Sequence, residues 1–353
     1  MAAPRDAIDL AAPAARLKDV ARRAGVSIKT VSNVVNRYEH VSATTRARVL
    51  AAIAELGYRP NLAARSLRQS RVGVIALEVP SLGIGYFTEF ASYVNEAAQR
   101  RGYLLLLDHT GGRHASEKRL VHGLRPMLID GAILNPLSLR RTELDPAQAG
   151  VPIVLVGERQ FGQLYDHVTI DNVAAAKEAT RHLLLHGRRR IAAIGLDGSR
   201  RAGDTIRRRW WGFSTAMEEA GLPVRDDWVL PGVDQGRRDG LASVRRLLAP
   251  PLRPDAIFCF NDTVAIGALR GLREAGVGVP DEVAVVAVDD IEEGRFSTPS
   301  LSTIAPDKAG IARLAVELLI DRINGRRTGP GELFEVGYTL LVRESTAGGT
   351  IPV

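Results

Sequence analysis

The segment spanning residues 27–36, SIKTVSNVVN, sets several short hydrogen-bonding side chains among its valines. Hydroxyl and amide groups of this size can donate hydrogen bonds to phosphate oxygens, a contact that positions a protein on DNA without reading its sequence. The candidates for this contact are Ser27, Thr30, Ser32 and Asn36. Three other side chains can contact base edges: Lys29 can donate to guanine acceptors, Asn33 can pair with adenine, and Ile28 can pack on the methyl group of thymine. Because ordinary surface helices also carry Ser and Asn, the segment alone leaves both interpretations open.

Three short helices are expected to position these side chains. The first, LKDVARRA, has an apolar face and stops at Gly25. Ser27 is a favourable N-cap for the second helix, whose valines recur at spacings of three and four. The third begins after Ser42 and ends at Gly57. Two short helices joined by a tight glycine-containing turn, with a third that completes a small core, are typical of a helix-turn-helix domain. The valine face is needed for that core, so the polar face of the second helix stays free for a DNA groove.

The excess positive charge lies at the start of the chain. There are 47 Lys and Arg against 40 Asp and Glu, a net charge of +7. Residues 1–70 hold 12 of the basic and 5 of the acidic residues, so residues 71–353 carry 35 of each and are neutral overall. A small basic module on a neutral body is typical of a polyanion-binding domain attached to a separate core. Charge alone also allows a basic segment that is merely solvated.

The same stretch resembles the DNA-binding head of the lactose/galactose-repressor (LacI/GalR) family. The matching motifs are DVA, AGVS, TVS–VN, VS–TR and GY–PN–AR–L, within about residues 15–70. The resemblance implies that Ile28, Lys29 and Asn33 read bases in the major groove. Many relatives have Tyr and Arg in place of Ile28 and Asn33, so the DNA sequence recognised should differ from theirs. The other DNA contacts that it implies for the head are Leu17, Lys18, Ser27, Thr30, Ser32, Asn36, His40, Thr45 and Tyr58.

Residues 60–71, PNLAARSLRQSR, follow the head and have the composition of a linker. The resemblance implies a hinge that becomes helical when two copies meet over the operator. Leu67 would then wedge between base pairs in the minor groove, with Asn61 and Ala64 beside it. Such a wedge costs base unstacking and yields a bent duplex that contacts more protein.

Apolar runs alternate with helix-length segments through the rest of the chain. The runs are VGVIALEV, YLLLLDHT, DGAILNP, PIVLVGE, RIAAIGL, DAIFCFND and EVAVVAVDD. Continuous β-branched and Leu-rich runs predict strands buried on both faces, hence parallel α/β sheets with helices on either side. Because there are more strands than one sheet comfortably holds, we expect two doubly wound subdomains and a final stretch that crosses back between them. The resemblance implies the same architecture, the periplasmic-binding-protein fold.

The sequence patterns and the resemblance predict a division of the chain into a head, a hinge and a core between two tails. The expected segments are a tail at 1–14, the helix-turn-helix domain at 15–59, the hinge at 60–71, the core at 72–346 and a tail at 347–353. Within the core we expect an N-subdomain at about 72–170 and 301–328, and a C-subdomain at about 171–300 and 329–346.

Polar side chains at strand ends are candidates for binding a small molecule, because ligands of parallel sheets bind beyond the carboxyl ends of the strands. Asn261 follows the run IFCF, Asp289 follows VAVVAV, and Arg209 lies three residues before a glycine in RRRWWGF. The resemblance implies that these three contact an effector. Capping of the following helices is the simpler role for the neighbouring Asp262 and Asp290.

Three further residues complete the expected effector site. Tyr86 and Phe87 stand before the first helix of the body and can supply an apolar wall. Several relatives have Asp after the strand VLV, where this chain has Gly157 and then Glu158, so its effector can differ from theirs. A carboxylate, an amide and a guanidinium together suit several hydroxyl groups or a polar ring.

No catalytic, metal or cofactor chemistry is expected. The sequence contains no G-x-S-x-G, Walker or dinucleotide motif. His182 and His186 have the spacing of a metal-binding pair but lack the HExxH pattern, so a capping or core role is expected. The single cysteine, Cys259, excludes an intramolecular disulfide and cannot by itself form a thiolate metal site.

These features predict a sequence-specific transcriptional regulator, in the first instance a repressor, controlled by a sugar or related polar metabolite in the core cleft. The resemblance implies a homodimer on a pseudo-palindromic operator. No apolar run reaches the roughly 20 residues that span a bilayer, and the N-terminus lacks the features of a signal peptide. We therefore expect no membrane partner and a cytoplasmic location. A solute-binding protein of a transport system and, less favoured, an enzyme on an α/β core stay open as alternatives.

Overall fold

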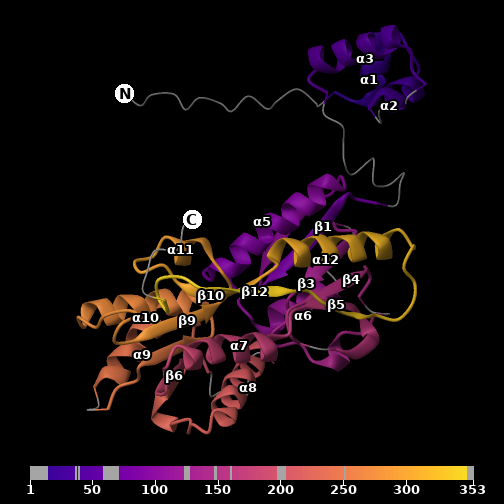
Figure 1. The fold of residues 1–353 in the computed structure, drawn as a ribbon. Helices are drawn as coiled ribbons and strands as arrows, with labels where there is room; N and C mark the ends of the chain where they lie inside the picture. Colours follow the sequence, from indigo (N-terminus) through magenta and orange to yellow (C-terminus); the bar gives the residue numbers. More distant parts are fainter. Residues whose placement is uncertain are drawn as a thin grey trace, which may run out of the picture. The chain divides into compact units, whose positions relative to one another are not determined.

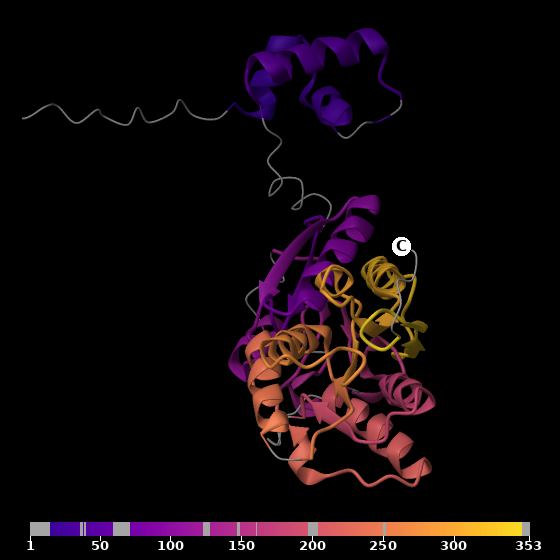
Figure 2. The same cartoon turned by 60° about the vertical axis from the view of Figure 1, so that its left-hand side comes forward.

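The computed structural model describes residues 15–35, 38, 40–58, 71–122, 128–146, 149–159, 161–196, 204–249 and 252–347. The chain divides into two compact units, Met1–Val72 and Gly73–Val353 (Figures 1 and 2). Some expectations fall outside the described residues. They concern the tails at 1–14 and 348–353, Asn36, and the hinge up to residue 70 with Asn61, Ala64 and Leu67.

The first unit contains the three expected helices. These are α1 (Leu17–Ala24), α2 (Ile28–Val35) and α3 (Ala43–Glu55). Gly25 ends α1 with a φ of 64°, a left-handed conformation that costs glycine little. The backbone N–H of Thr30 donates to Ser27 Oγ, so the predicted cap of α2 is confirmed, and the N–H of Thr45 donates to Ser42 Oγ, which caps α3 in the same way.

Valines from all three helices form the core of this unit. Val31 and Val34 of α2 pack with Val20 of α1 and Val49 of α3, and none of the four is more than 4% exposed. The buried stripe of α2 is therefore the one that the valine spacing predicts. Its opposite face takes no part in the core.

The second unit begins with a six-stranded sheet in the order β11-β5-β4-β3-β1-β2, with every neighbouring pair parallel. Its strands are β1 (Val74–Val79), β2 (Leu104–His109), β3 (Gly131–Leu134), β4 (Ile153–Val156), β5 (Asp166–Thr169) and β11 (Leu333–Glu335). The helices are α5 (Gly85–Arg100), α6 (His114–His122) and α12 (Lys308–Ile323), with short 3-10 helices at Arg141–Glu143 and Gly162–Leu164. The N-subdomain is this sheet with α5, α6 and α12, of which α5 and α12 pack side by side (Figure 1).

A second six-stranded sheet has the order β12-β10-β9-β8-β6-β7 and is parallel except for the β10–β12 pair. Its strands are β6 (Ile191–Ile194), β7 (Val229–Leu230), β8 (Ala256–Cys259), β9 (Ala284–Val288), β10 (Ser302–Pro306) and β12 (Tyr338–Leu341). The helices are α7 (Asn172–Leu185), α8 (Asp204–Glu219), α9 (Arg237–Leu248), α10 (Asp262–Glu274) and α11 (Glu292–Arg295), with a 3-10 helix at Asp226–Trp228. The C-subdomain is this sheet with α7 to α11.

Both faces of the second sheet are covered, as its apolar runs predict. Ile257 and Val285 pack in the cluster that contains α9 and α10, whereas Phe258 and Val286 pack with α7 and α8. The predicted fold class, a helical head followed in sequence by two parallel α/β subdomains, is confirmed.

Three crossovers connect the subdomains: β5 to α7, β10 to α12, and β11 to β12. Asp307 N–H donates to the Gly337 carbonyl and Val336 N–H to the Thr169 carbonyl, so the three segments lie side by side. The expected boundaries at 301 and 329 differ from this arrangement, because β10 pairs with β9 in the C-subdomain and β11 with β5 in the N-subdomain. Periodicity along the chain carries no information about which sheet a strand joins.

One predicted strand is less buried than expected. The run YLLLLDHT forms β2, but β2 is the edge strand of its sheet, and Leu104, Leu106 and Leu107 are 57%, 37% and 42% exposed. Edge position is the physical reason, since β2 has a strand neighbour on one side only. Within the described residues, no helix combines the length and apolarity that a bilayer crossing requires.

Candidate nucleic-acid face and ligand cavity

The predicted DNA contacts on α2 lie on its solvent side. Ile28 is 47% exposed, Ser27 and Lys29 are exposed, and Thr30 and Asn33 are half-buried. Of the remaining described candidates, Leu17 and Lys18 begin α1, Ser32 lies on α2, and Thr45 lies in the first turn of α3. His40 is exposed in the loop before α3, where it makes an edge contact with Tyr38. Tyr58 differs from the rest of the set because its side chain is 7% exposed and packs in the core.

Arginines of the head hold the turn between α1 and α2. Arg48 Nη2 donates to the carbonyls of Ala24 and Gly25, which end α1. Arg23 pairs with Glu55 at 2.6 Å and so ties α1 to the end of α3. Carbonyls at a helix end lack partners within the helix, and Arg48 satisfies two of them. These contacts tie α3 to α1 and to the turn that precedes α2.

A cavity of about 500 Å³ lies between the two subdomains of the core. All six predicted effector residues line it, namely Tyr86, Phe87, Glu158, Arg209, Asn261 and Asp289. The loops that carry most of them follow carboxyl ends of strands in both sheets, which is where ligands of such sheets bind. Its volume is in the range of ordinary small-molecule sites.

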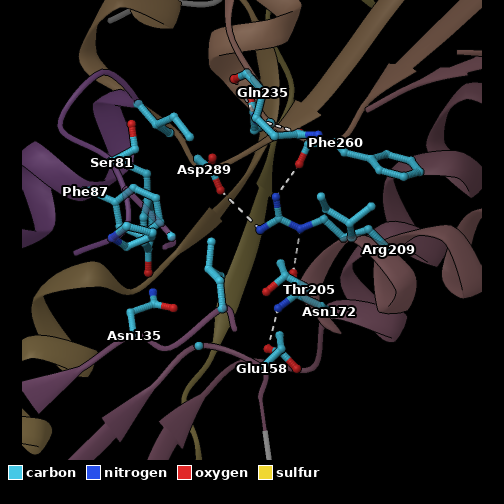
Figure 3. A pocket seen from close by; sticks show the side chains of 18 of the residues that line it. Ser81, Phe87, Asn135, Glu158, Asn172, Thr205, Arg209, Gln235, Phe260 and Asp289 are labelled. Carbon is cyan, nitrogen blue, oxygen red and sulfur yellow. Dashed lines mark hydrogen bonds and ion pairs between the residues drawn. The ribbon is translucent and has the colours of Figure 1, made fainter. Parts of the chain in front are cut away.

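Four polar side chains form a continuous chain along the cavity (Figure 3). Asn172 Nδ2 donates to Glu158 Oε1 at 2.6 Å, and Arg209 Nε donates to Asn172 Oδ1 at 2.7 Å. Arg209 Nη2 then donates to Asp289 Oδ1 at 3.2 Å, and its Nη1 donates to the Phe260 carbonyl. The chain begins in the N-subdomain, at Glu158 after β4, and ends in the C-subdomain, at Asp289 after β9. Arg209 is only 8% exposed, so its direction is fixed before any ligand arrives.

The buried charges of the cavity are paired. Arg209 neutralises Asp289, and Arg208 Nε lies 3.1 Å from Glu158 Oε2. Burial raises the pKa of Glu158, against hydrogen bonds from Thr169 and Asn172 and the charge of Arg208. Burial likewise raises the pKa of Asp289, which Arg209 lowers. No uncompensated charge is left among these four groups to select a charged ligand.

Aromatic rings form part of the opposite wall. Tyr86 stacks parallel to Phe90 at 6.0 Å and meets Phe87 edge-on at 5.4 Å. Burial raises the pKa of the Tyr86 phenol, so the hydroxyl keeps its proton at neutral pH and can donate. This wall offers an apolar surface with one polar end.

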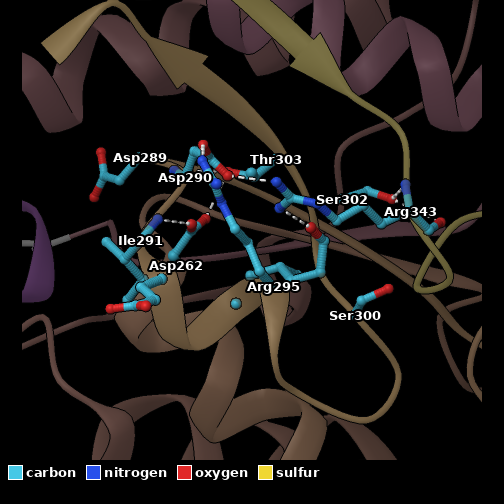
Figure 4. A network of polar contacts seen from close by, with 12 residues as sticks. Asp262, Asp289, Asp290, Ile291, Arg295, Ser300, Ser302, Thr303 and Arg343 are labelled. Atoms are coloured by element: carbon cyan, nitrogen blue, oxygen red, sulfur yellow. Dashed lines mark hydrogen bonds and ion pairs between the residues drawn. The ribbon is translucent and has the colours of Figure 1, made fainter. Parts of the chain in front are cut away.

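Asp262 and Asp290 have structural roles, but neither caps the following helix as expected, because the N-caps of α10 and α11 are Asn261 and Ile291. Asp262 is fully buried and accepts hydrogen bonds from Thr303 Oγ1 and Ile291 N–H (Figure 4). Asp290 binds two arginines, Arg295 at 2.5 Å and Arg343 at 2.6 Å. Neither carboxylate lines the cavity.

Asn261 combines a structural role with its place in the cavity wall. Its Oδ1 caps α10 by accepting from Val264 N–H at 2.7 Å, and its Nδ2 points to Gln235 Oε1 at 3.1 Å. Both ends of the amide are therefore engaged within the protein, which fixes the orientation of Asn261 in the cavity wall. His182 and His186 also match expectation, since their rings bind Thr346 Oγ1 and the His182 carbonyl.

Several cavity residues escaped the sequence analysis. Asn135 follows β3 directly, so the strand-end rule that found Asn261 applies to it equally. Gln235 follows β7, a strand of two residues that is too short to be recognised from the sequence. Asn172 begins α7, and nothing in the sequence distinguishes it from an ordinary helix start. The other polar residues of the lining include Ser81, His109, Thr169, Thr205 and Asp234.

Comparisons with known proteins cover both units. The family described as "Bacterial regulatory proteins, lacI family" matches residues 16–61, and "Periplasmic binding protein-like domain" matches residues 180–346. The HTH-type transcriptional repressor PurR of Pasteurella multocida is 33% identical over 94% of this chain and 98% of its own length. The structure of the transcriptional regulator CelR–cellobiose complex is 32% identical, with a TM-score of 0.68 over 94% of this chain and 99% of that one. The lac repressor dimer bound to operator and the anti-inducer ONPF is 26% identical, with a TM-score of 0.81 over 95% of this chain and 99% of that one.

Proposed function

Because the chain belongs to the lacI family of bacterial regulatory proteins, we propose that it is a cytoplasmic transcriptional repressor that reads its operator through Ile28, Lys29 and Asn33. A small molecule in the core cavity controls its affinity for DNA. Its relatives are regulators, so the alternatives of a transport-system solute receptor and an enzyme are set aside.

The observation that carries the proposal is the division of α2 into two faces. Val31 and Val34 are buried in the head, while Ile28 and Lys29 remain exposed. A helix of eight residues leaves only this second face for a partner, and its side chains suit phosphates and base edges. We assign the DNA backbone contacts to the remaining polar and N-terminal helix positions of the head, namely Leu17, Lys18, Ser27, Thr30, Ser32, Asn36, His40 and Thr45.

The effector is proposed to be a neutral polyhydroxylated compound such as a sugar. Arg209 with Asp289, and Arg208 with Glu158, already balance each other. Carboxylate oxygens and amide groups around a wall of Tyr86 and Phe87 suit hydroxyls on the rim of a ring and the apolar face of that ring. The cellobiose bound to the CelR relative is a compound of this class.

The operator complex is proposed to contain two copies of this chain. The lac repressor relative is a dimer on its operator, and β2 offers an exposed apolar edge here. Leu104, Leu106 and Leu107 project from one strand of six residues. Exposed edge strands with apolar side chains are prone to pair with another chain, and a second copy of the protein is the occupant that we propose.

Substitutions of Lys29 and Lys18 test the division between residues that read bases and residues that contact the phosphate backbone. After selection of bound fragments from random DNA, Lys29→Ala should relax the preference at one base pair, because a base-edge contact is worth about 1–3 kcal/mol of discrimination. Lys18→Ala should weaken binding to all sequences by a similar factor and flatten the salt dependence, because it removes a phosphate contact. Titrations of selected and scrambled fragments at several salt concentrations distinguish the two. An equal loss on both fragments in both variants would refute the assignment.

A further inference from the structure

Lys308, the first residue of α12, is a lysine only 7% exposed at the crossover from β10. Its ammonium donates to the backbone carbonyl of Asp289 at 2.9 Å, to that of Asp290 at 2.7 Å, and to the carboxylate of Glu89. A lysine ammonium has three donors and no acceptor, so these bonds use its full capacity. Neither Lys308 nor Glu89 lines the cavity.

The two carbonyls belong to a strained piece of backbone. Asp289 has a φ of 126° and Asp290 a φ of 48°, values that residues with a Cβ seldom adopt. Such conformations persist where the surrounding contacts hold them. Lys308 holds both carbonyls with charge-assisted bonds, and the side chain of Asp289 is thereby directed at Arg209 (Figure 3).

Glu89 joins Lys308 to α5 of the same N-subdomain and makes a contact of its own with the C-subdomain. It lies on α5, three residues after the cavity residue Tyr86. Its Oε1 accepts from the N–H of Glu292, the first residue of α11, at 2.7 Å. Gly85, at the start of α5, packs so closely that a Cβ there would lie 3.1 Å from Ile291 Cδ1. Helix α5 of the N-subdomain therefore both lines the cavity, through Tyr86, and contacts the C-subdomain, through Gly85 and Glu89.

The charges of both residues also act on the ligand site. Beyond burial, which raises the pKa of Asp289, and Arg209, which lowers it, Lys308 lowers that pKa and Glu89 raises it. Separation of Glu89 from Lys308 would thus change the pKa of the Asp289 carboxylate as well as the direction in which this side chain points.

We propose that Glu89 and Lys308 form a clasp that couples Asp289 in the ligand site to the relative arrangement of the two subdomains. The proposal rests on the proposed function. Lys308 is a positioning residue for Asp289, and Glu89 links it to α5. A ligand that hydrogen-bonds to the Asp289 carboxylate shifts the carbonyls of Asp289 and Asp290 that Lys308 binds. Lys308 and Glu89 transmit this shift to α12 and α5 of the N-subdomain. Because coupling between sites is reciprocal, an arrangement favoured by bound DNA changes the affinity for the ligand.

The test measures the distance between the subdomains in the full chain without ligand or DNA. Spin labels are placed on cysteines introduced at Lys118 of α6 and Arg245 of α9, whose side chains are 50% and 69% exposed. The one native cysteine, Cys259, is buried and should not react. A large excess of unlabelled protein leaves one labelled copy in each dimer. Double electron–electron resonance then gives the distribution of distances within one chain.

The wild type should give one dominant distance, and Glu89→Gln and Lys308→Met should each add a second population. The double variant should add no more than either single variant, because both residues act through one contact. The matched controls are Lys177→Met and Glu219→Gln, an ion pair at 2.6 Å between α7 and α8 within the C-subdomain, and they should leave the distribution unchanged. Glu89→Gln preserves side-chain shape, so it carries the test if Lys308→Met does not fold.

A wild-type distribution in folded Glu89→Gln, or an equal change in the control variants, would overturn the clasp. Retardation of the selected DNA fragments is measured on the same samples. A second population in a protein that retards no DNA would support the clasp while refuting the proposed function, so the two failures are distinguishable.

Discussion

Asp262 is a fully buried carboxyl at the first position of α10, adjacent in sequence to the cavity residue Asn261. Its two oxygens accept from Thr303 Oγ1 at 2.6 Å and from Ile291 N–H at 2.9 Å. Burial, reinforced by the nearby charge of Asp289, raises the pKa of Asp262 to about 7 against these two hydrogen bonds. The folded protein therefore holds a proton here at pH values where the unfolded chain has released it.

Because ionisation of Asp262 is disfavoured in the folded state, the fold loses stability as pH rises. Below the ordinary Asp pKa of 3.8 the carboxyl is protonated in both states, and stability is unaffected. Between 3.8 and about 7 only the unfolded state ionises, so the free energy of unfolding falls as pH rises. Each pH unit corresponds to about 1.4 kcal/mol, which gives a loss of roughly 4 kcal/mol by neutral pH.

Asp262→Asn removes this titration and keeps the shape of the side chain. One oxygen still accepts from Ile291, and the amide can donate to Thr303 Oγ1. The variant should gain stability relative to wild type by about 1.4 kcal/mol per pH unit between pH 5 and 7, and by a constant amount above the folded pKa. Urea unfolding followed by tryptophan fluorescence measures this in the right subdomain, because Trp210, Trp211 and Trp228 all lie in the C-subdomain.

Glu219→Gln provides a control of opposite sign. Hydrogen bonds from Lys177 and Arg181 lower the pKa of Glu219, so wild-type Glu219 stabilises the fold above its unfolded pKa and loses that contribution as pH falls. This variant should be less stable than wild type at neutral pH, with a difference that shrinks in acid. A difference between Asp262→Asn and wild type that stays constant from pH 5 to 8 would refute the reasoning about Asp262.

Two further predictions concern the ligand site and the dimer. Asp289→Ala should abolish the effect of ligand on DNA retardation while DNA binding without ligand persists, with the ligand chosen by thermal shift from a panel of sugars; a retained response would remove Asp289 from the site. Leu107→Glu should convert dimer to monomer in sedimentation at micromolar concentration, because it would bury a carboxylate against apolar surface. Leu185→Glu, at an 85% exposed position away from β2, is the control that should stay dimeric. A dimer that survives Leu107→Glu would exclude β2 from the interface.

The head could be predicted almost completely because its signals are local. Gly25, Ser27 and Ser42 set helix ends through contacts within four residues, and the valines of α2 define its buried face by spacing alone. The strands of the core could also be predicted from local signals, as could the places of Asn261 and Asp289 at strand ends. Side chains at the carboxyl ends of parallel strands meet at one edge whatever the details of packing.

The sequence by itself thus determined the helices, the strands, the excess charge of the head and five of the polar groups that line the cavity, namely Tyr86, Glu158, Arg209, Asn261 and Asp289. Only the tertiary structure decided that β10 and β11 join opposite sheets, that β2 is an exposed edge, and that Lys308 meets Glu89 and the carbonyls of Asp289 and Asp290. These features depend on pairings between residues up to 219 positions apart. Periodicity and capping extend over one or two turns of a helix, whereas strand order and buried charge pairs are fixed only when distant segments pack together.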